Sequence, residues 1–263
     1  MDGAQYQADP ADLCRRGMRV EALLDGEMEG IGRNVAPHLL ACASEDLLIR
    51  MQPGILRNSI SPHALLYLDS PLEFAQLAAR LRRRLLIQLP NGRKMLLRLQ
   101  DARVLEPLVQ VLAGAQFDDF FNFCERCWYV DTSLNWSRVD AKVSAHDPEN
   151  YCLQLDGAQR KALQDACYPH AVIAHFLDTE PALLDPVSSG ERYACIRDAL
   201  RAARQFGIEQ SADAIVFCTL ALVEGREFHQ RPDWRQWLAE VAQGHRTLSE
   251  VLDEHYLGTS EEV

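Results

Sequence analysis

The chain lacks any long hydrophobic run: none of its apolar stretches approaches the roughly 18–20 residues that a membrane-spanning helix needs. It also lacks an excess of positive charge, because 27 Lys and Arg residues stand against 38 Asp and Glu residues, a net charge of -11. Nucleic-acid-binding proteins need a basic surface. The first residues have neither the basic leader nor the apolar core of a secretory signal. We therefore expect a cytoplasmic protein with no membrane span and no nucleic-acid partner.

Common catalytic and cofactor motifs are absent as well. The sequence contains no G-x-S-x-G nucleophile turn, no G-x-x-x-x-G-K-[ST] phosphate loop and no G-x-G-x-x-G dinucleotide loop. Asp118 and Asp119 are adjacent, which favours a solvated helix face or a cap over a pair of catalytic carboxylates. His170 and His175 are five residues apart, so one helix face does not stack them as the HExxH spacing would. We expect no catalytic residue and no cofactor.

The eight cysteines are expected to be reduced thiols, because disulfides are rare in the cytoplasm. Cys124 and Cys127 have the C-x-x-C spacing of metal and redox sites, and Cys167 with His170 would supply the nearest second pair of ligands. Aromatic residues surround the first pair, and buried free cysteine is common. We therefore expect buried thiols without a metal, with a zinc site on these four residues as the alternative.

The length of 263 residues suits one large domain or two small lobes, and 48% hydrophobic residues suffice for a sizeable core. Residues 1–131 mix helix and strand patterns, whereas residues 155–258 contain helix patterns alone. We predict an α+β fold with an N-terminal mixed α/β lobe, in which helices flank a small sheet. A polar, weakly patterned connection is expected over residues 132–154, followed by an all-helical C-terminal lobe.

The individual elements follow from hydrophobic periodicity and from residues typical of helix starts. Predicted strands of the first lobe are Arg19–Leu24, part of Val35–Ala43, His63–Leu68, Leu85–Leu89, Met95–Leu99 and Cys127–Val130. Helices of that lobe are expected to begin near Pro10, Ser44, Ser70, Asp101 and Gln116. In the second lobe, helices are expected to begin near Asp156, Pro169, Ser188, Ser211, Pro232 and Thr247.

The stretch Leu85–Leu105 organises the first lobe. Two apolar runs flank Asn91-Gly92, a dipeptide typical of tight hairpin turns. Asp101 follows the second run and directly precedes a helical pattern, so we predict that it caps this helix. A carboxylate at that position can accept hydrogen bonds from the helix N–H groups and from an arginine such as Arg98 or Arg103.

The segment Arg98-Leu99-Gln100-Asp101-Ala102-Arg103-Val104-Leu105 resembles the R-[FY]-x-D-P-R-V-L-like motif of a family called domain of unknown function 4123, adaptors and chaperones of bacterial type VI secretion. In that family a basic helix end, an apolar strand and a turn precede the motif, as they do here. Ala102 replaces the usual proline and Leu99 the usual aromatic residue. The family's first strand is also shortened: of its Y-A-L-L-D-G-A pattern only Asp2-Gly3-Ala4 is present, which predicts an open sheet edge.

The resemblance implies a non-enzymatic adaptor that binds a toxin effector and helps to load it onto the secretion spike, the valine-glycine repeat protein. It identifies Arg98, Asp101 and Arg103 as signature positions, which we expect to be mainly structural. A cleft between the lobes or the open sheet edge is the expected contact region. The identity of the effector, the spike-binding surface and the oligomeric state do not follow from the sequence.

Two further groups are candidates for partner contacts. Arg80, Arg83 and Arg84 belong to a basic cluster at a predicted helix end, which is either an outward-facing helix terminus or a patch that docks an acidic segment. Trp234 and Trp237 share one face of a predicted helix, where core packing is the default and a partner-binding face is the alternative.

The sequence is also compatible with two other classes of function. One is a small hydrolase or transferase with a cleft between the lobes, which would place titratable groups with strongly shifted pKa values in a concave pocket. The other is a zinc-stabilised interaction module, which metal analysis of the purified protein would identify.

Overall fold

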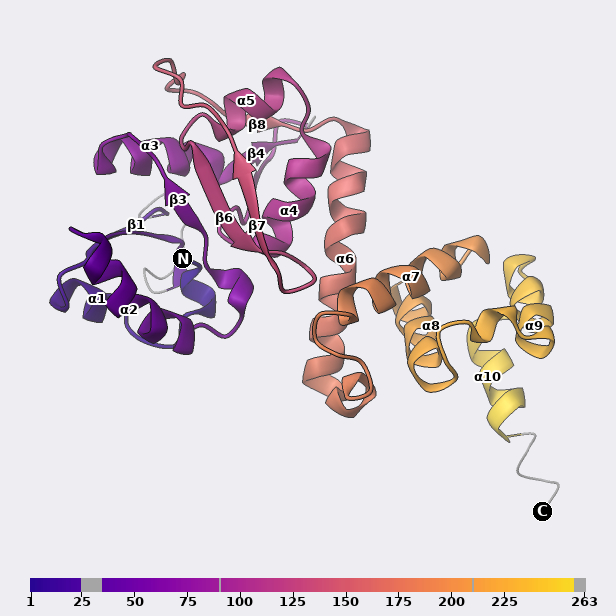
Figure 1. Ribbon diagram of the computed structural model, residues 1–263. Coiled ribbons are helices and arrows are strands. Elements are labelled where there is room, and N and C mark those ends of the chain that lie inside the picture. Colours follow the sequence, from indigo (N-terminus) through magenta and orange to yellow (C-terminus); the bar gives the residue numbers. More distant parts are fainter. Residues whose placement is uncertain (25–34, 90, 210, 258–263) are drawn as a thin grey trace. The chain divides into compact units, whose positions relative to one another are not determined.

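The computed structural model describes residues 1–24, 35–89, 91–209 and 211–257. The chain divides into two compact units, Met1–Cys167 and Tyr168–Val263, and the boundary falls inside one helix. Strands occur in the first unit and helices in both, so the α+β prediction is confirmed (Figure 1). None of the described helices combines the length and the apolar character needed to cross a membrane.

Among its described residues, the first unit contains six α-helices, two short 3-10 helices and eight strands. The α-helices are α1 (Ala11–Arg15), α2 (Glu45–Arg57), α3 (Phe74–Arg84), α4 (Ala102–Val111), α5 (Ala115–Phe121) and the first part of α6 (Gly157–Thr179). The strands are β1 (Arg19–Ala22), β2 (His38–Ala41), β3 (Tyr67–Asp69), β4 (Leu86–Gln88), β5 (Lys94–Leu96), β6 (Arg126–Val130), β7 (Trp136–Asp140) and β8 (Leu153–Gln154).

These strands form three small sheets, with orders β1-β2, β3-β6-β7 and β5-β4-β8. All neighbours are antiparallel except β4 and β8, which are parallel. Because β2 and β3 each end a sheet, each has one edge without a described partner strand.

Two hydrophobic clusters of the first unit lie on opposite faces of β2. Leu39 belongs to the larger cluster, which collects side chains of α3, α4, α5 and β6. The neighbouring residue Leu40 packs against a smaller cluster that includes Met51 and Ile55 of α2. Successive side chains of a strand point to opposite faces, so β2 separates the two clusters.

A buried ion pair anchors the C-terminal end of α3. The Arg84 side chain is 0% exposed and its Nη2 lies 2.6 Å from Oδ1 of Asp147, which is 4% exposed. Arg84 also donates to the backbone oxygens of Asp119 and Phe120. Burial lowers the pKa of Arg84, whereas the hydrogen bonds from Arg84 and Arg83 outweigh burial at Asp147 and lower its pKa.

The second unit is helical. It contains the rest of α6, then α7 (Arg192–Gln205), α8 (Ser211–Val223), α9 (Pro232–Ala242) and α10 (Leu248–Leu257), with short 3-10 segments between them. Its core includes Phe176, Ile196, Phe217 and Trp234. The helices α7, α8, α9 and α10 each contribute buried side chains to that core.

Two predictions about the middle of the chain need correction. Residues 132–154, expected to form a connection, contain β7 and β8, which pair with β6 and β4 inside the first unit. The structure therefore places the division between the units at Cys167, later than expected. Pro169 does not begin a second helix, because α6 continues through it. The helix continues because Val172 and Phe176 on its later turns pack into the core of the second unit.

The central hairpin forms, with a turn that differs from the predicted one. β4 and β5 pair antiparallel, and the Leu89 N–H donates to the carbonyl oxygen of Arg93. Gly92 has a φ of 79°. Because Leu89 bonds to Arg93, the loop that closes this hairpin is longer than a two-residue Asn-Gly turn. Pro90 lies outside the described residues.

Replacing Asp147 by Ala is expected to lower the free energy of unfolding by about 3–5 kcal/mol, because it leaves the buried Arg84 guanidinium without its counter-charge. Urea unfolding followed by circular dichroism measures this change. Lys161→Ala is the matched control, since it removes an ion pair on α6 in which the lysine is 76% exposed, and it should cost at most about 0.5 kcal/mol. Equal losses in the two variants would contradict this account of Arg84.

Candidate binding site

A cavity of about 940 Å³ lies in the first unit, between β2 and β3. Most of its lining is apolar and comes from both hydrophobic clusters; the side chains include Met18, Leu39, Leu40, Ile55, Leu68, Leu77, Leu81, Leu105 and Phe123. We call it the β2–β3 pocket. Its size and apolar lining are typical of ligand-binding pockets, in which a few polar groups fix the orientation of the ligand.

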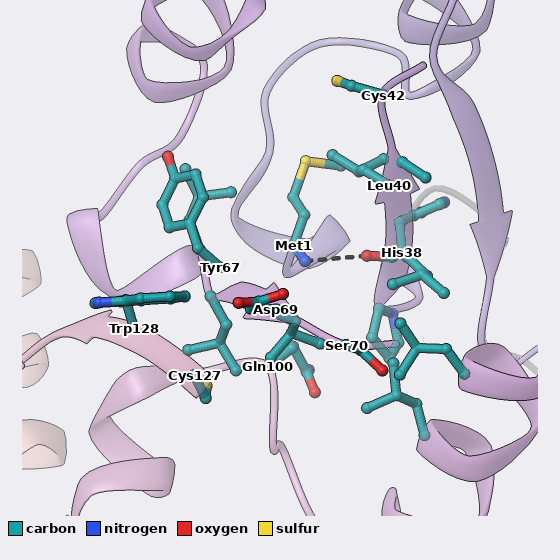
Figure 2. A pocket seen from close by; sticks show the side chains of 18 of the residues that line it. Met1, His38, Leu40, Cys42, Tyr67, Asp69, Ser70, Gln100, Cys127 and Trp128 are labelled. Carbon is teal, nitrogen blue, oxygen red and sulfur yellow. Dashed lines mark hydrogen bonds between the residues drawn. The ribbon is translucent and has the colours of Figure 1, made fainter. Parts of the chain in front are cut away.

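Met1 lies between the two walls at one end of this pocket. Figure 2 shows Tyr67 on one side of Met1 and Leu40 with His38 on the other. The Met1 amino group donates to the His38 carbonyl oxygen at 3.0 Å, and the His38 N–H donates back to the Met1 carbonyl oxygen at 2.9 Å. Burial lowers the pKa of this amino group to about 6. The N-terminal segment thus occupies one end of the space between β2 and β3.

Two buried polar atoms of the pocket lining lack hydrogen-bond partners. They are Nδ1 of His38, a residue 6% exposed, and Oε1 of Gln100, a residue 8% exposed. Burial, and then the charge of the amino terminus, lowers the pKa of His38, so this imidazole is neutral near pH 7. Buried polar groups are normally satisfied. A ligand with hydrogen-bonding groups could therefore gain contacts here that an aliphatic chain could not.

A charged network adjoins the pocket at Gln100. The Asp101 carboxylate caps α4 by accepting from the Arg103 N–H, and it accepts two more hydrogen bonds from the Arg103 guanidinium, at 2.9 and 2.8 Å. Arg98 pairs with Asp101 at 3.2 Å and donates to Asp2 at 2.8 Å. Gln5 donates to Asp2 and accepts from Arg103. The predicted cap at Asp101 is therefore present.

This network joins the N-terminal segment to the start of α4. Burial alone would raise the pKa of Asp2, but hydrogen bonds from Gln5 and Arg98 outweigh it and lower that pKa. Burial would lower the pKa of Arg103, yet its contacts with Asp101 raise it. Both groups are therefore charged across the neutral range, and the contacts hold Asp2 in place beside the pocket.

Aromatic side chains cover the outer face of the neighbouring sheet. Tyr67 of β3 and Trp128 of β6 are opposite each other and line the pocket. Trp136 of β7 is 57% exposed, and its ring lies 5.5 Å from that of Tyr67. Large exposed aromatic residues are enriched in protein interfaces. The pocket and this face form one continuous candidate binding surface, which sequence analysis missed because Trp136 lies in the expected connection.

The predicted basic patch does not exist in the expected form. Arg80 and Arg84 are buried, and Arg80 donates to the carbonyl oxygens of Asn122 and Ser144. Arg83, 24% exposed, pairs with Asp147. The sequence of an arginine run does not show whether its side chains face solvent or the carbonyl groups of the interior, so it could not distinguish these arrangements. These three residues support the fold of the first unit.

The two tryptophans of α9 pack within the second unit. Trp234 is 0% exposed, and its ring meets that of Phe228 edge-to-face at 5.1 Å. Trp237 is half-buried and lies 5.5 Å from Trp234. Their positions agree with core packing, the default interpretation. A partner contact at Trp234 would require this core to open.

The cysteine spacing does not correspond to a metal cluster in the described part of the chain, where no group of three or more His, Cys, Asp or Glu side chains could hold a metal ion. Cys124 and Cys127 are buried among core residues, and Cys167 donates to the Arg103 carbonyl oxygen at 3.7 Å. Burial raises the pKa of Cys124 to about 12 and raises that of Cys127 as well. Protonated thiols are poor nucleophiles and poor metal ligands.

Comparison with known proteins gives a match for the N-terminal part of the chain. Residues 1–119 match the family model described as "Domain of unknown function (DUF4123)". Residues 1–119 are therefore similar to the DUF4123 family, and the match covers less than half of the chain. No curated protein and no solved structure matches the chain. The DUF4123 match contains β2, β3 and the Asp101 network, but it ends within α5, before β6, β7 and β8.

Asp101→Ala should destabilise the protein by about 2–4 kcal/mol, because it removes the α4 cap and leaves Arg98 and Arg103 short of a counter-charge. Asp156→Ala is the control. Asp156 accepts from the Gln159 N–H at an exposed helix start, and losing such a cap costs about 0.5–2 kcal/mol. Urea unfolding of both variants measures the difference. A smaller loss at Asp101 than at Asp156 would mean that the network contributes nothing beyond capping.

The buried thiols should react slowly with a disulfide reagent such as DTNB. At pH 8 the exposed Cys14 should react at least tenfold faster than Cys124 and Cys127, whose burial and raised pKa values suppress the thiolate. Mass spectrometry of partly labelled protein assigns each rate, and Cys14→Ser should remove the fast phase. Rapid labelling of Cys127 in the folded protein would show that the pocket wall opens.

Proposed function

We propose that the protein is a non-enzymatic adaptor that binds a toxin effector of type VI secretion and helps to load it onto the spike, the valine-glycine repeat protein. The DUF4123 match supports this proposal through the resemblance noted in the sequence. The observation that carries it is the β2–β3 pocket with the aromatic face beside it. Such a surface suits the capture of another polypeptide.

The chemistry of the pocket favours binding over bond cleavage. Among its titratable lining groups, Asp69 pairs with Arg126 at the outer face, and the raised pKa of Cys127 keeps that thiol protonated. His38 is held neutral by burial, but its ring nitrogen Nδ1 has no hydrogen-bond partner. A nucleophile needs an activating base within hydrogen-bond reach. These features give no specific support to the hydrolase or transferase alternative.

Loading onto the spike requires two contacts, one with the effector and one with the spike. The first unit offers the pocket and the aromatic face, and the second unit offers exposed apolar side chains such as Val223, which is 60% exposed. We assign the effector to the first unit and leave the spike to the second. The experiment is co-expression of the chain with the toxin and spike proteins encoded beside it, followed by co-purification. If the chain co-purifies with neither protein, the proposal is wrong.

Trp136→Ala should weaken effector binding at least tenfold, because exposed aromatic side chains often contribute 2 kcal/mol or more at an interface, a value on the order of measured hot spots. The thermal midpoint should change little, since Trp136 is 57% exposed. Isothermal titration calorimetry with the purified effector measures the affinity. Val223→Ala is the control on the second unit, and it should bind the effector as the unmodified chain does. Equal affinities for all three proteins would place the effector elsewhere.

A further inference from the structure

The two walls of the β2–β3 pocket are strand edges that point backbone groups at each other. In β2, His38 turns its N–H and carbonyl oxygen to Met1, whereas Pro37 accepts from Leu23 on the β1 side. Hydrogen-bonding direction alternates along an antiparallel strand. Leu40 therefore directs its N–H and carbonyl oxygen away from β1 and toward the pocket.

The same alternation fixes the direction of β3. The Asp131 N–H, directly after β6, donates to the Asn135 carbonyl oxygen, so the odd-numbered residues of β6 bond to β7 and the even-numbered ones bond to β3. Trp128 and Arg126 lie opposite Tyr67 and Asp69, so those two residues of β3 bond to β6. Leu68, between them, directs its backbone groups to the pocket. Among the described residues, β2 and β3 have no strand partner on these edges.

The first two residues of the chain show how this space is filled at one end. Met1 exchanges two hydrogen bonds with His38 on the β2 side, and the Asp2 N–H donates to the Ala64 carbonyl oxygen at 2.8 Å on the β3 side. Bonds that alternate between two neighbours are the pattern of a central strand. The separation of the two walls at this end therefore fits one extended chain, and the pocket continues the same space along Leu40 and Leu68.

From these contacts we infer that the β2–β3 pocket takes an extended segment of the partner protein as an added strand, which pairs with β2 on one side and β3 on the other. This inference rests on the proposed function and names the form of the bound partner. The strand would join two of the sheets into one, in the order β1, β2, partner strand, β3, β6, β7. Addition of a strand to an open edge is an established mode of peptide recognition.

The lining determines the chemistry of that segment. Side chains on one face of the added strand would meet Met18 and Ile55, and those on the other face would meet Leu81 and Phe123. A strand buried on both faces is continuously apolar rather than alternating. Four residues of β2 set its length. The partner segment is therefore an uncharged run of about four apolar residues, and its backbone N–H groups, unlike a lipid chain, can satisfy open carbonyl groups.

The direct test uses a synthetic peptide, acetyl-Lys-Ser-Val-Leu-Val-Leu-Ser-Lys-amide, with the 15N-labelled chain. Bound peptide should slow amide exchange at Leu40 and Leu68 at least tenfold and leave Leu39 and Ala41 unchanged, because those two residues face β1. The control is the same peptide with two alternate backbone nitrogens methylated. It should bind at least tenfold more weakly, since two donors are lost while the side chains stay the same.

Three outcomes of this experiment would overturn the inference. The first is no binding of the parent peptide at a concentration of about 1 mM, at which even a weak complex would be detected. The second is equal binding of the methylated peptide, which would show that apolar contact suffices, as for a lipid chain. The third is protection of Leu40 and Leu68 before any peptide is added, which would show that the chain itself or a second copy fills the pocket.

A second experiment separates this inference from the adaptor proposal. Val-Leu-Val-Leu inserted directly before Met1 should continue the Met1–His38 pairing into the pocket, raise the thermal midpoint by roughly 5 °C and abolish effector binding. Ser-Gly-Ser-Gly at the same place is the control and should leave effector binding intact. If the apolar insertion stabilises the protein yet the effector still binds, strand addition is wrong while the adaptor proposal stands. If the unmodified chain retains neither effector nor spike, the adaptor proposal itself fails.

Discussion

The first unit depends on a pair of buried carboxylates, Asp2 and Asp101, held between two arginines. Two like charges so close together would repel in an apolar interior, and Arg98 and Arg103 offset that repulsion with short hydrogen bonds. The network ties three parts of the chain that are distant in sequence: the N-terminal segment, the end of the central hairpin and the start of α4. It thereby fixes where Met1 lies, and so where the β2–β3 pocket begins.

The buried arginines of α3 serve internal architecture. Arg84 satisfies carbonyl oxygens at the end of α5 and pairs with Asp147, although the sequence suggested an outward-facing basic patch. The surface that is suited to a partner is instead apolar and aromatic, around the pocket, Tyr67 and Trp136. The proposed recognition by shape and backbone pairing would suit a protein with a net charge of -11.

Local signals in the sequence predicted much of the fold. Asp101 as a helix cap, the hairpin around Gly92 and most helix starts follow from interactions within a few residues, which a single sequence records. Strand β7 pairs with its neighbour β6, but its mostly exposed side chains leave little hydrophobic pattern in the sequence. Strand β8 escaped prediction because its partner β4 is distant along the chain. The candidate site escaped for the same reason: Leu40 and Leu68 read as ordinary core residues until both strand edges are seen in space. The predicted helix start at Pro169 was wrong because packing of the later turns of α6 outweighs the unfavourable helix propensity of proline.

The boundary of the family match has a consequence for how this domain is handled and inherited. The match ends at residue 119, yet β3 and β4 find their partners β6 and β8 only beyond it, and the compact unit extends to Cys167. A fragment cut at residue 119 would expose two further apolar strand edges and would lose Asp147, the counter-charge of Arg84. A fragment that keeps this unit intact, whether made by truncation or exchanged by recombination, must therefore be longer than the segment that matches the family.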